Sequence, residues 1–216
     1  MSSVIKIFVI GFNKTGTCSI QKIFKSFSIN SIHTTTPVLE IIDQYDAFCD
    51  GNHVNFIDYY NKYPNSLFIL NTRPLGKWLI SRYKHAKGRN FAKSWCWPIT
   101  TERTLQWIQD RHQHHKNIFN FFRKFPKQLF VVNIERDNWQ SHLMNFIGDN
   151  YRKKYDNLDL NEIHRNKIDE DNFNVDILNQ IITNVHKSLH ESSMGYNELL
   201  FKGYNIEKFK WIKMYL

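Results

Sequence analysis

An apolar stretch that runs into a glycine-framed loop near the start of the chain constrains the fold more than any other segment. Residues 4–10 are apolar apart from Lys6, which is the pattern of a buried β-strand. Gly11 and Gly16 frame the loop that follows, and residues 17–28 then have the spacing of an amphipathic helix. Backbone N–H groups at such a junction converge on one point, where the helix N-terminus also favours negative charge. The segment therefore predicts an anion-binding site.

The position of the lysine in this loop distinguishes it from the loops that bind nucleoside triphosphates. Gly11 and Gly16 have the G-x-x-x-x-G spacing of a P-loop, in which Lys and then Ser or Thr follow the second glycine. Here Thr17 and Cys18 follow it, and the lysine is Lys14, two residues before Gly16. We therefore expect the loop to bind an anion other than a magnesium-bound triphosphate.

Length, charge and cysteine content limit the kind of protein. With 216 residues, of which 42% are hydrophobic, the chain can bury the core of one domain spanning residues 1–216. Its formal net charge of +9 favours an anionic partner without identifying it. The three cysteines have neither metal-site nor redox spacing, and no apolar run reaches the ~18 residues that a membrane-spanning helix needs. We expect a cytoplasmic protein with reduced thiols, no bound metal and no transmembrane anchor.

Apolar runs alternate with helical patterns along most of the chain, which is typical of a parallel sheet covered on both faces. The predicted strands are residues 4–10, 29–33, 47–49, 67–70 and 129–134. The predicted helices are residues 17–28, a helix after Pro37, 56–63, 74–85, 102–123, 139–147 and 176–190. The expected fold class is α/β, a three-layer α/β/α domain of the P-loop type with a mainly parallel sheet of about five strands and extra C-terminal helices.

A second group of polar residues follows the predicted strand 67–70. Arg73 stands just past that strand, at the carboxyl edge where α/β proteins bind ligands. Ser81 comes eight residues later, about two turns into a helix that starts at Pro74, and so faces roughly the same side as Arg73. A guanidinium and a hydroxyl on one side can bind a second phosphate. The simpler alternative is an arginine that ends the strand and an incidental helix serine.

Together these two segments resemble the sulfotransferases that use 3′-phosphoadenosine 5′-phosphosulfate (PAPS). The resemblance rests on Gly-Phe-Asn-Lys-Thr-Gly-Thr-x-Ser at residues 11–19 and on Thr-Arg-Pro at 72–74 with its later serine, and it extends over roughly residues 4–148. It implies that the first segment binds the 5′-phosphosulfate of the donor, and that Arg73 and Ser81 bind its 3′-phosphate. It also implies that the transfer needs no metal.

The resemblance assigns a role to each residue of the loop. Lys14 would neutralise charge that develops on the oxygen between sulfate and phosphate, although an exposed loop lysine is the alternative. Hydroxyls of Thr17 and Ser19 would assist the backbone in binding the 5′-phosphate. Similar sequences often have Thr or Ser where this chain has Cys18, so a weak thiol donor replaces a hydroxyl. The backbone N–H groups concerned are those of Thr15, Gly16, Thr17, Cys18 and Ser19.

Transfer to a hydroxyl benefits from a general base beside the acceptor oxygen. Asp50 is the first candidate, because it follows the predicted strand 47–49 and so reaches the same sheet edge as Lys14 and Arg73. An aspartate before a glycine is also a common turn residue. Similar sequences usually continue with proline and an aromatic residue, whereas this chain has Gly-Asn-His at 51–53.

The long predicted helix 102–123 supplies two further candidates for the base, His112 and His115. They share one face with an apolar set spaced three and four residues apart, namely Leu105, Ile108, Phe119 and Phe122. Burial of both histidines as neutral groups is the alternative interpretation. Arg111 and His114 are expected to point away from this face into solvent.

Two later segments combine basic residues with aromatic or amide side chains. Trp95 and Trp97 lie among the lysines and arginines of residues 87–98, a composition that suits a sugar ring or an anionic acceptor, or that simply packs the loop. The His-Arg-Asn-Lys segment at residues 164–167 suits closure over the 3′-phosphate, or forms an ordinary charged turn.

The sequence supports a sulfotransferase that acts on a hydroxyl of a small molecule or glycan, with carbohydrate slightly favoured over a lipid, a small alcohol or a tyrosine. One alternative is a small-molecule or nucleotide kinase, although the Gly-Lys-Ser/Thr signature is missing from the loop. The other is a non-catalytic basic module that binds anions or nucleic acid, which explains the charge but not two phosphate sites. Nucleic acid is therefore not the expected partner, and the sequence indicates no oligomeric state.

Overall fold

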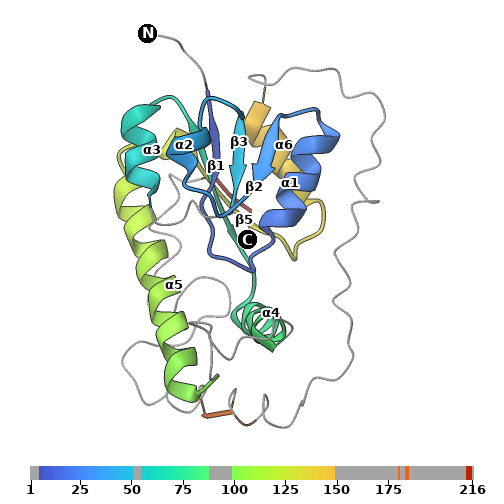
Figure 1. The fold of residues 1–216 in the computed structure, drawn as a ribbon, viewed down its shortest axis with the longest axis vertical. Coiled ribbons are helices and arrows are strands. Elements are labelled where there is room, and N and C mark those ends of the chain that lie inside the picture. Colours follow the sequence, from blue (N-terminus) through green and yellow to red (C-terminus); the bar gives the residue numbers. More distant parts are fainter. Residues whose placement is uncertain are drawn as a thin grey trace.

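The strand β1 (Ile7–Val9) lies inside a sheet of parallel strands. The computed structural model describes residues 5–50, 55–87, 99–148, 180, 183–184 and 213–215. Within these residues the sheet has six strands in the order β2-β3-β1-β4-β5-β6, and every neighbouring pair is parallel (Figure 1). The other strands are β2 (Ser31–His33), β3 (Ala47–Cys49), β4 (Leu67–Thr72), β5 (Leu129–Asn133) and β6 (Lys213–Tyr215).

Helices cover both faces of the sheet, which confirms the predicted α/β fold class. Alternate residues of β1 point to opposite faces, as strand geometry requires. Ile7 and Val9 belong to one apolar core with α1 and α6, whereas Phe8 and Ile10 belong to another with α2, α3 and α5. The helices are α1 (Thr17–Ser26), α2 (Val38–Ile41), α3 (Phe56–Lys62), α4 (Leu75–Lys87), α5 (Thr101–Phe122) and α6 (Trp139–Ile147), with a 3-10 turn η1 (Pro126–Gln128) before β5.

β1 lies where the chain changes direction across the sheet. After β1 the chain forms β2 and β3 on one side, and it then forms β4, β5 and β6 on the other. The register brings Val9 level with Cys49 of β3 and with Ile69 of β4. In open α/β sheets, ligands bind beyond the carboxyl ends of the strands at such a switch point. The segments after β1, β3 and β4 are therefore brought together at the edge where a site is expected.

The sheet has one strand more than the sequence predicted. β6 lies beside β5, and Met214 is level with Val131. No strand was predicted after residue 134, because three residues are too few to show a periodicity and the pairing with β5 decides their structure. The expected helix over 176–190 lies mostly outside the described residues, although residues 180, 183 and 184 are helical.

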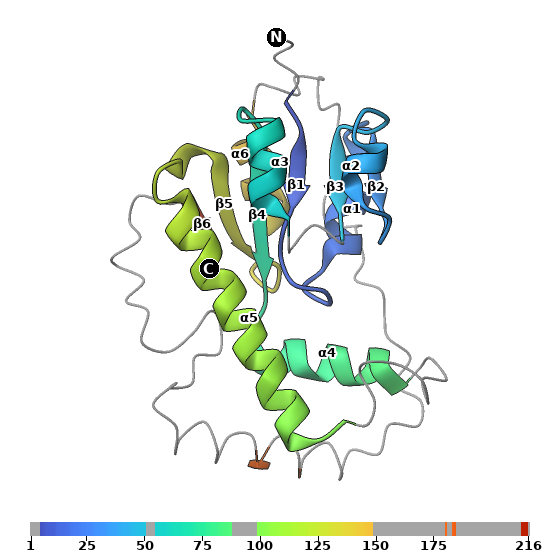
Figure 2. The same cartoon turned by 60° about the vertical axis from the view of Figure 1, so that its left-hand side comes forward.

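α4 and α5 enclose the carboxyl edge of the sheet. Figure 2 shows α4 lying crosswise beyond the end of β4, while α5 runs along one side of the molecule. Their facing side chains form a third apolar cluster, in which Trp78 and Tyr83 of α4 pack with Trp107 and Ile108 of α5. This cluster gives the loops at the sheet edge a firm support.

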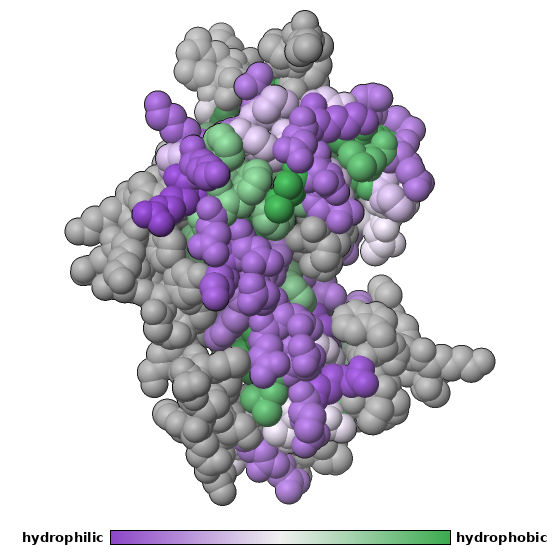
Figure 3. All heavy atoms as spheres, turned by 90° about the vertical axis from the view of Figure 1, so that its left-hand side faces the viewer, coloured by the Kyte–Doolittle hydropathy of each residue, from purple (hydrophilic) through white to green (hydrophobic). Residues whose placement is uncertain are grey.

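The outer face of α5 is polar, and Figure 3 shows a mostly hydrophilic band on this side of the molecule. Among the described helices, none combines the length and the apolar character needed to cross a membrane. The exposed residues of α5 are Glu102, Gln106, Gln109, Asp110, Gln113, Lys116, Asn117 and Asn120.

Replacement of Phe8 by alanine should test the core on the α5 side. Phe8 is fully buried, and its ring centroid lies 5.5 Å from that of Phe48, 4.7 Å from Tyr59 and 5.3 Å from Phe68. Loss of such a side chain removes apolar burial and leaves a cavity, so we expect the free energy of unfolding to fall by about 3–5 kcal/mol. Urea denaturation followed by circular dichroism measures it. The control Leu39→Ala changes an exposed side chain and should cost under about 0.5 kcal/mol; equal losses in the two variants would contradict the assigned core.

Candidate active site

The loop after β1 approaches β4 so closely that no side chain fits at Gly11. A Cβ atom on Gly11 would lie 2.2 Å from both the backbone oxygen and the side-chain Oδ1 of Asn71, near the end of β4. The Gly11 N–H donates to this Oδ1 at 3.0 Å. A side chain at position 11 would break this hydrogen bond and push the loop away from the sheet.

The amide of Asn71 also holds the far side of the same loop. Its Nδ2 donates to the backbone oxygen of Thr15 at 2.9 Å and to the Thr15 hydroxyl at 2.7 Å. Asn71 and Thr15 are both fully buried, and the Thr15 hydroxyl donates in turn to the backbone oxygen of Phe12. One side chain of β4 thus fixes both ends of the loop, and the Thr15 hydroxyl is used in this support.

Two left-handed residues shape the centre of the loop. Lys14 has φ 66° and Gly16 has φ 94°, and a Cβ atom on Gly16 would lie 2.3 Å from Cδ1 of Ile134. A left-handed lysine costs about 1–2 kcal/mol, so the surrounding contacts must impose it. Gly16 precedes the first turn of α1, which contains no acidic residue, and the first hydrogen bond into α1 is donated by Ile20. The earlier N–H groups of the helix and its positive dipole end can therefore receive an anion.

Side chains of α4 hold the tip of the loop. The indole of Trp78 donates to the backbone oxygen of Asn13 at 3.0 Å, and Arg82 donates to the Asn13 side-chain oxygen. The Arg82 guanidinium carbon lies 4.3 Å from the ring centroid of Trp107 on α5. The aromatic cluster between α4 and α5 thus positions a buried cation beneath the loop.

Arg73 lies against the loop, just beyond the end of β4. Its Nη1 donates to the backbone oxygen of Lys14 at 3.4 Å, and its Nη2 pairs with Oε1 of Glu135 at 2.5 Å. Glu135 follows β5, and its other oxygen accepts from Lys77 at 3.0 Å. The Nε atom of Arg73 is buried without a hydrogen-bond partner among the described residues. This guanidinium therefore has a donor left for a further acceptor.

Ser81, the second member of the predicted 3′-phosphate site, is buried in α4 with 5% of its surface exposed. Within the described residues it shares no hydrogen bond with Arg73, whose guanidinium contacts Lys14 and Glu135 instead. The protein itself therefore does not link the predicted pair directly.

α5 turns a polar part of its surface toward the sheet edge, which corrects two expectations. Arg111 and His114, expected in solvent, are both buried. Arg111 Nη2 donates to the Thr72 hydroxyl and to the backbone oxygen of Arg73, both at 2.8 Å, and His114 Nε2 donates to the backbone oxygen of Ile10 at 2.6 Å. These side chains donate hydrogen bonds at the carboxyl ends of β4 and β1. The hydrophobic pattern of α5 did not predict their burial, because the surface that they cover is polar.

The two predicted histidines of α5 are weak bases in this environment. His115 is fully buried, and its pKa lies well below the usual range because of desolvation and then the charge of Arg111. The same two causes, in the same order, lower the pKa of His112 to about 4. Burial also lowers the pKa of Arg111, to about 9, so this arginine remains protonated at neutral pH. Both imidazoles are therefore neutral at pH 7.

Asp50 follows β3 and is joined there by a histidine that the sequence did not single out. Its φ of 75° is left-handed, and its Oδ2 lies 3.7 Å from Nε2 of His33, at the end of β2. The same nitrogen lies 3.0 Å from the hydroxyl of Thr17 and 3.1 Å from Sγ of Cys18. The start of α1 and the ends of β2 and β3 thus meet at one imidazole.

These contacts bring the loop after β1 and Arg73 together at one edge of the sheet, and a comparison with known families identifies the domain. A family model described as a sulfotransferase domain matches residues 35–157, more than half of the 216 residues. The chain belongs to the sulfotransferase family. It is therefore a transferase enzyme that carries out sulfotransfer. No curated protein matched the chain.

The matched region of this sulfotransferase begins after the glycine loop. It contains Asp50, Arg73 and Ser81, whereas residues 11–19 and His33 precede it. The contacts of Arg73 and Asn71 with the loop attach the unmatched segment to the matched one.

Several residues predicted for the sulfotransferase site lie outside the described residues. They are Gly51, Asn52 and His53 after Asp50, Trp95 and Trp97 with the basic residues around them, and residues 164–167.

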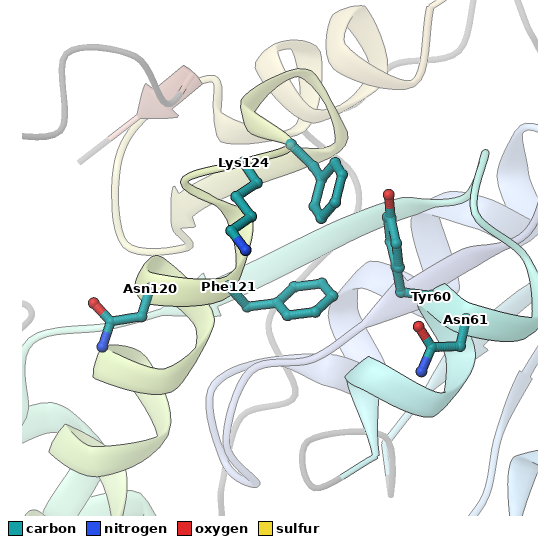
Figure 4. A pocket seen from close by; sticks show the side chains of 6 residues that line it. Tyr60, Asn61, Asn120, Phe121 and Lys124 are labelled. Carbon is teal, nitrogen blue, oxygen red and sulfur yellow. The ribbon is translucent and has the colours of Figure 1, made fainter.

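A cavity of about 290 Å³ in this sulfotransferase lies away from the loop, between α3 and α5 (Figure 4). The rings of Tyr60 and Phe121 meet there, with centroids 5.1 Å apart. α3 leads into β4, and α5 leads through η1 into β5, so the cavity lies toward the amino ends of these strands. The loop after β1 is at the opposite, carboxyl end. The lining residues are Tyr60, Asn61, Asn120, Phe121, Lys124 and Phe125.

Asn71→Ala should destabilise this sulfotransferase strongly, although the substitution removes only a few atoms. The change removes the partner of the Gly11 N–H and of two Thr15 oxygens inside the protein. Each buried group left without a partner costs about 1–3 kcal/mol, so we expect the free energy of unfolding to fall by about 3 kcal/mol in a urea titration. Asn120→Ala removes an exposed amide from α5 and should change it by under about 0.5 kcal/mol. Equal stability of the two variants would show that the amide of Asn71 does not hold the loop.

Proposed function

We propose that this sulfotransferase moves a sulfuryl group from PAPS to a hydroxyl of its acceptor, with carbohydrate the first acceptor class to test. PAPS carries a phosphosulfate and a separate 3′-phosphate, so it needs two anion sites. The observation that carries the proposal is the 3.4 Å contact between Arg73 and the backbone of Lys14, which brings the loop and the second segment side by side.

The chemistry of this site suits the two anionic groups of PAPS. The N-terminal N–H groups of α1, beside the left-handed Lys14 and Gly16, are donors suited to the 5′-phosphosulfate. Arg73 has a buried Nε without a hydrogen-bond partner among the described residues, which supports a role in binding the 3′-phosphate, and Ser81 lies on the following helix. The Thr15 N–H donates to Phe12 at 3.3 Å, so Thr15 contributes less than the N–H groups of residues 16–19.

Charge at the site is positive overall in spite of Glu135. This carboxylate pairs with both Arg73 and Lys77, which leaves the three groups with a net charge of +1. Arg111 adds a buried positive charge within hydrogen-bond distance of the Arg73 backbone oxygen. In the low dielectric of a protein edge, such charges attract a multiply charged donor over a longer range than in water.

In the proposed transfer, Lys14 neutralises charge on the oxygen that leaves with the adenosine bisphosphate. Asp50 is the preferred base for the acceptor hydroxyl, because it lies at the carboxyl end of β3 and keeps part of its surface exposed. His112 and His115 remain alternatives, but their lowered pKa values make them poor proton acceptors. As proposed, the reaction uses no metal.

Binding of adenosine 3′,5′-bisphosphate, the product of the donor, should not require magnesium. We expect isothermal titration calorimetry in EDTA to show binding, and we expect Arg73→Ala to weaken it about 10- to 100-fold through loss of charged hydrogen bonds. Arg136→Ala removes an exposed charge after β5 and should change the affinity by less than about threefold. Binding of ATP with magnesium in place of the bisphosphate would favour a kinase, and salt-dependent binding of DNA or RNA alone would favour a nucleic-acid module.

Lys14→Ala should impair transfer more than donor binding. If Lys14 acts on charge that develops in the transition state, turnover should fall about 100-fold or more while bisphosphate affinity changes less than about tenfold. Transfer from ³⁵S-labelled PAPS to a panel of sugars, alcohols, lipids and tyrosine peptides measures turnover and identifies the acceptor class. Lys25→Ala, at the exposed end of α1, is the matched control. Equal turnover in the two variants would exclude the role assigned to Lys14.

A further inference from the structure

One nitrogen of His33, Nε2, faces a thiol, a carboxylate and the hydroxyl of Thr17 beside the glycine loop. This Nε2 lies 3.1 Å from Sγ of Cys18 and 3.7 Å from Oδ2 of Asp50. Cys18 is an exposed thiol in the first turn of α1. The three residues come from α1, β2 and the end of β3, so the fold itself brings together a thiol, an imidazole and a carboxylate.

The surroundings of Cys18 favour its thiolate form. The hydrogen bond from His33 is the main cause that lowers the pKa of Cys18, and the charges of His33 and Lys14 act in the same direction. Partial burial and Asp50 oppose them but do not reverse the shift. The pKa of His33 is raised, first by its hydrogen bond to Cys18 and, with a smaller effect, by the charge of Asp50. The two shifts bring the pKa values of the thiol and the imidazole closer together, and the positive end of the helix dipole also favours the thiolate.

We propose that Cys18 is a nucleophilic thiolate, paired with the His33 imidazolium that Asp50 supports, and that it is a site of covalent modification by small disulfides. The Cys18 sulfur attacks one sulfur of a disulfide R–S–S–R. A Cys18–S–S–R bond forms, the R–S–S–R bond breaks, and R–S⁻ leaves with the electron pair. Cys18 is oxidised and the departing thiolate is the reduced product, so no other oxidant is needed.

Cys49 provides an internal comparison. It lies on β3, the strand next to that of His33, in a different environment. It is level with His33 in the sheet but has only 1% of its surface exposed. Desolvation is the main cause that raises its pKa well above the usual range. A buried thiol of this kind is inert, so reactivity at neutral pH should distinguish Cys18 from Cys49.

Modification rates measured for each cysteine test the proposal. The folded protein is treated with iodoacetamide between pH 5.5 and 9, and peptide mass spectrometry follows Cys18 and Cys49 separately. The same protein unfolded in urea gives the reference rate for an unperturbed thiol, of which about 1% is thiolate at pH 6.5. We expect Cys18 in the folded protein to react at least about fivefold faster than this reference at pH 6.5, and Cys49 to react more slowly than it.

Variants of the imidazole identify the cause of the reactivity. His33→Gln keeps the size of the side chain but cannot carry a proton, and it should lower the Cys18 rate at pH 6.5 by about fivefold or more and shift the profile to higher pH. His142→Gln changes an exposed histidine of α6 and should leave the rate unaltered. Circular dichroism establishes that each variant is folded. With oxidised glutathione in place of iodoacetamide, the folded protein should gain one glutathione on Cys18, removable by dithiothreitol.

Two results would overturn the proposal. One is a Cys18 rate in the folded protein no higher than the rate in urea at pH 6.5. The other is an unchanged Cys18 rate in a folded His33→Gln variant. No nucleotide is present in these experiments, so their outcome does not depend on whether the protein uses PAPS.

Discussion

Asn71 lies fully buried near the end of β4 and bonds to both sides of the loop after β1. The amide bonds to the Gly11 N–H and to both Thr15 oxygens. The loop is therefore fixed to β4 as well as to β1, the strand from which it continues. The close approach also explains why residue 11 must be glycine. With its ends held, the loop can keep Lys14 in a left-handed conformation that a free segment would leave.

Buried cations beneath the loop make this geometry electrostatically suited to anions. Arg82 lies among the rings of α4 and α5, and Arg111 bonds to the end of β4. Burying a guanidinium is costly, and the lowered pKa of Arg111 reflects that cost. The aromatic faces and backbone oxygens around the two arginines offset part of it. These charges at the carboxyl ends of β1 and β4 favour a ligand with several negative charges.

Local patterns made the central elements predictable. The strand, the framing glycines and the start of α1 all belong to one continuous segment, and the carboxyl-edge positions of Asp50 and Arg73 follow from their place after apolar runs. The residues that were missed act across the fold. Asn71, His33 and Glu135 are single polar residues near strand ends, and only the strand order brings them to the loop. The buried side of α5 was misjudged for the same reason, since part of the surface it covers is made of backbone oxygens.

The position of Lys14, before Gly16 rather than after it, is related to its contact with Arg73. In a loop of this spacing, a lysine after Gly16 would stand at the start of α1, whereas Lys14 stands at a left-handed turn whose backbone oxygen accepts from Arg73. Arg73 thus helps to fix the backbone of Lys14. Since Arg73 belongs to the matched sulfotransferase region and Lys14 does not, this contact couples the two parts. In the proposed site, a shift of Arg73 toward a bound 3′-phosphate would therefore also move the Lys14 backbone that it contacts.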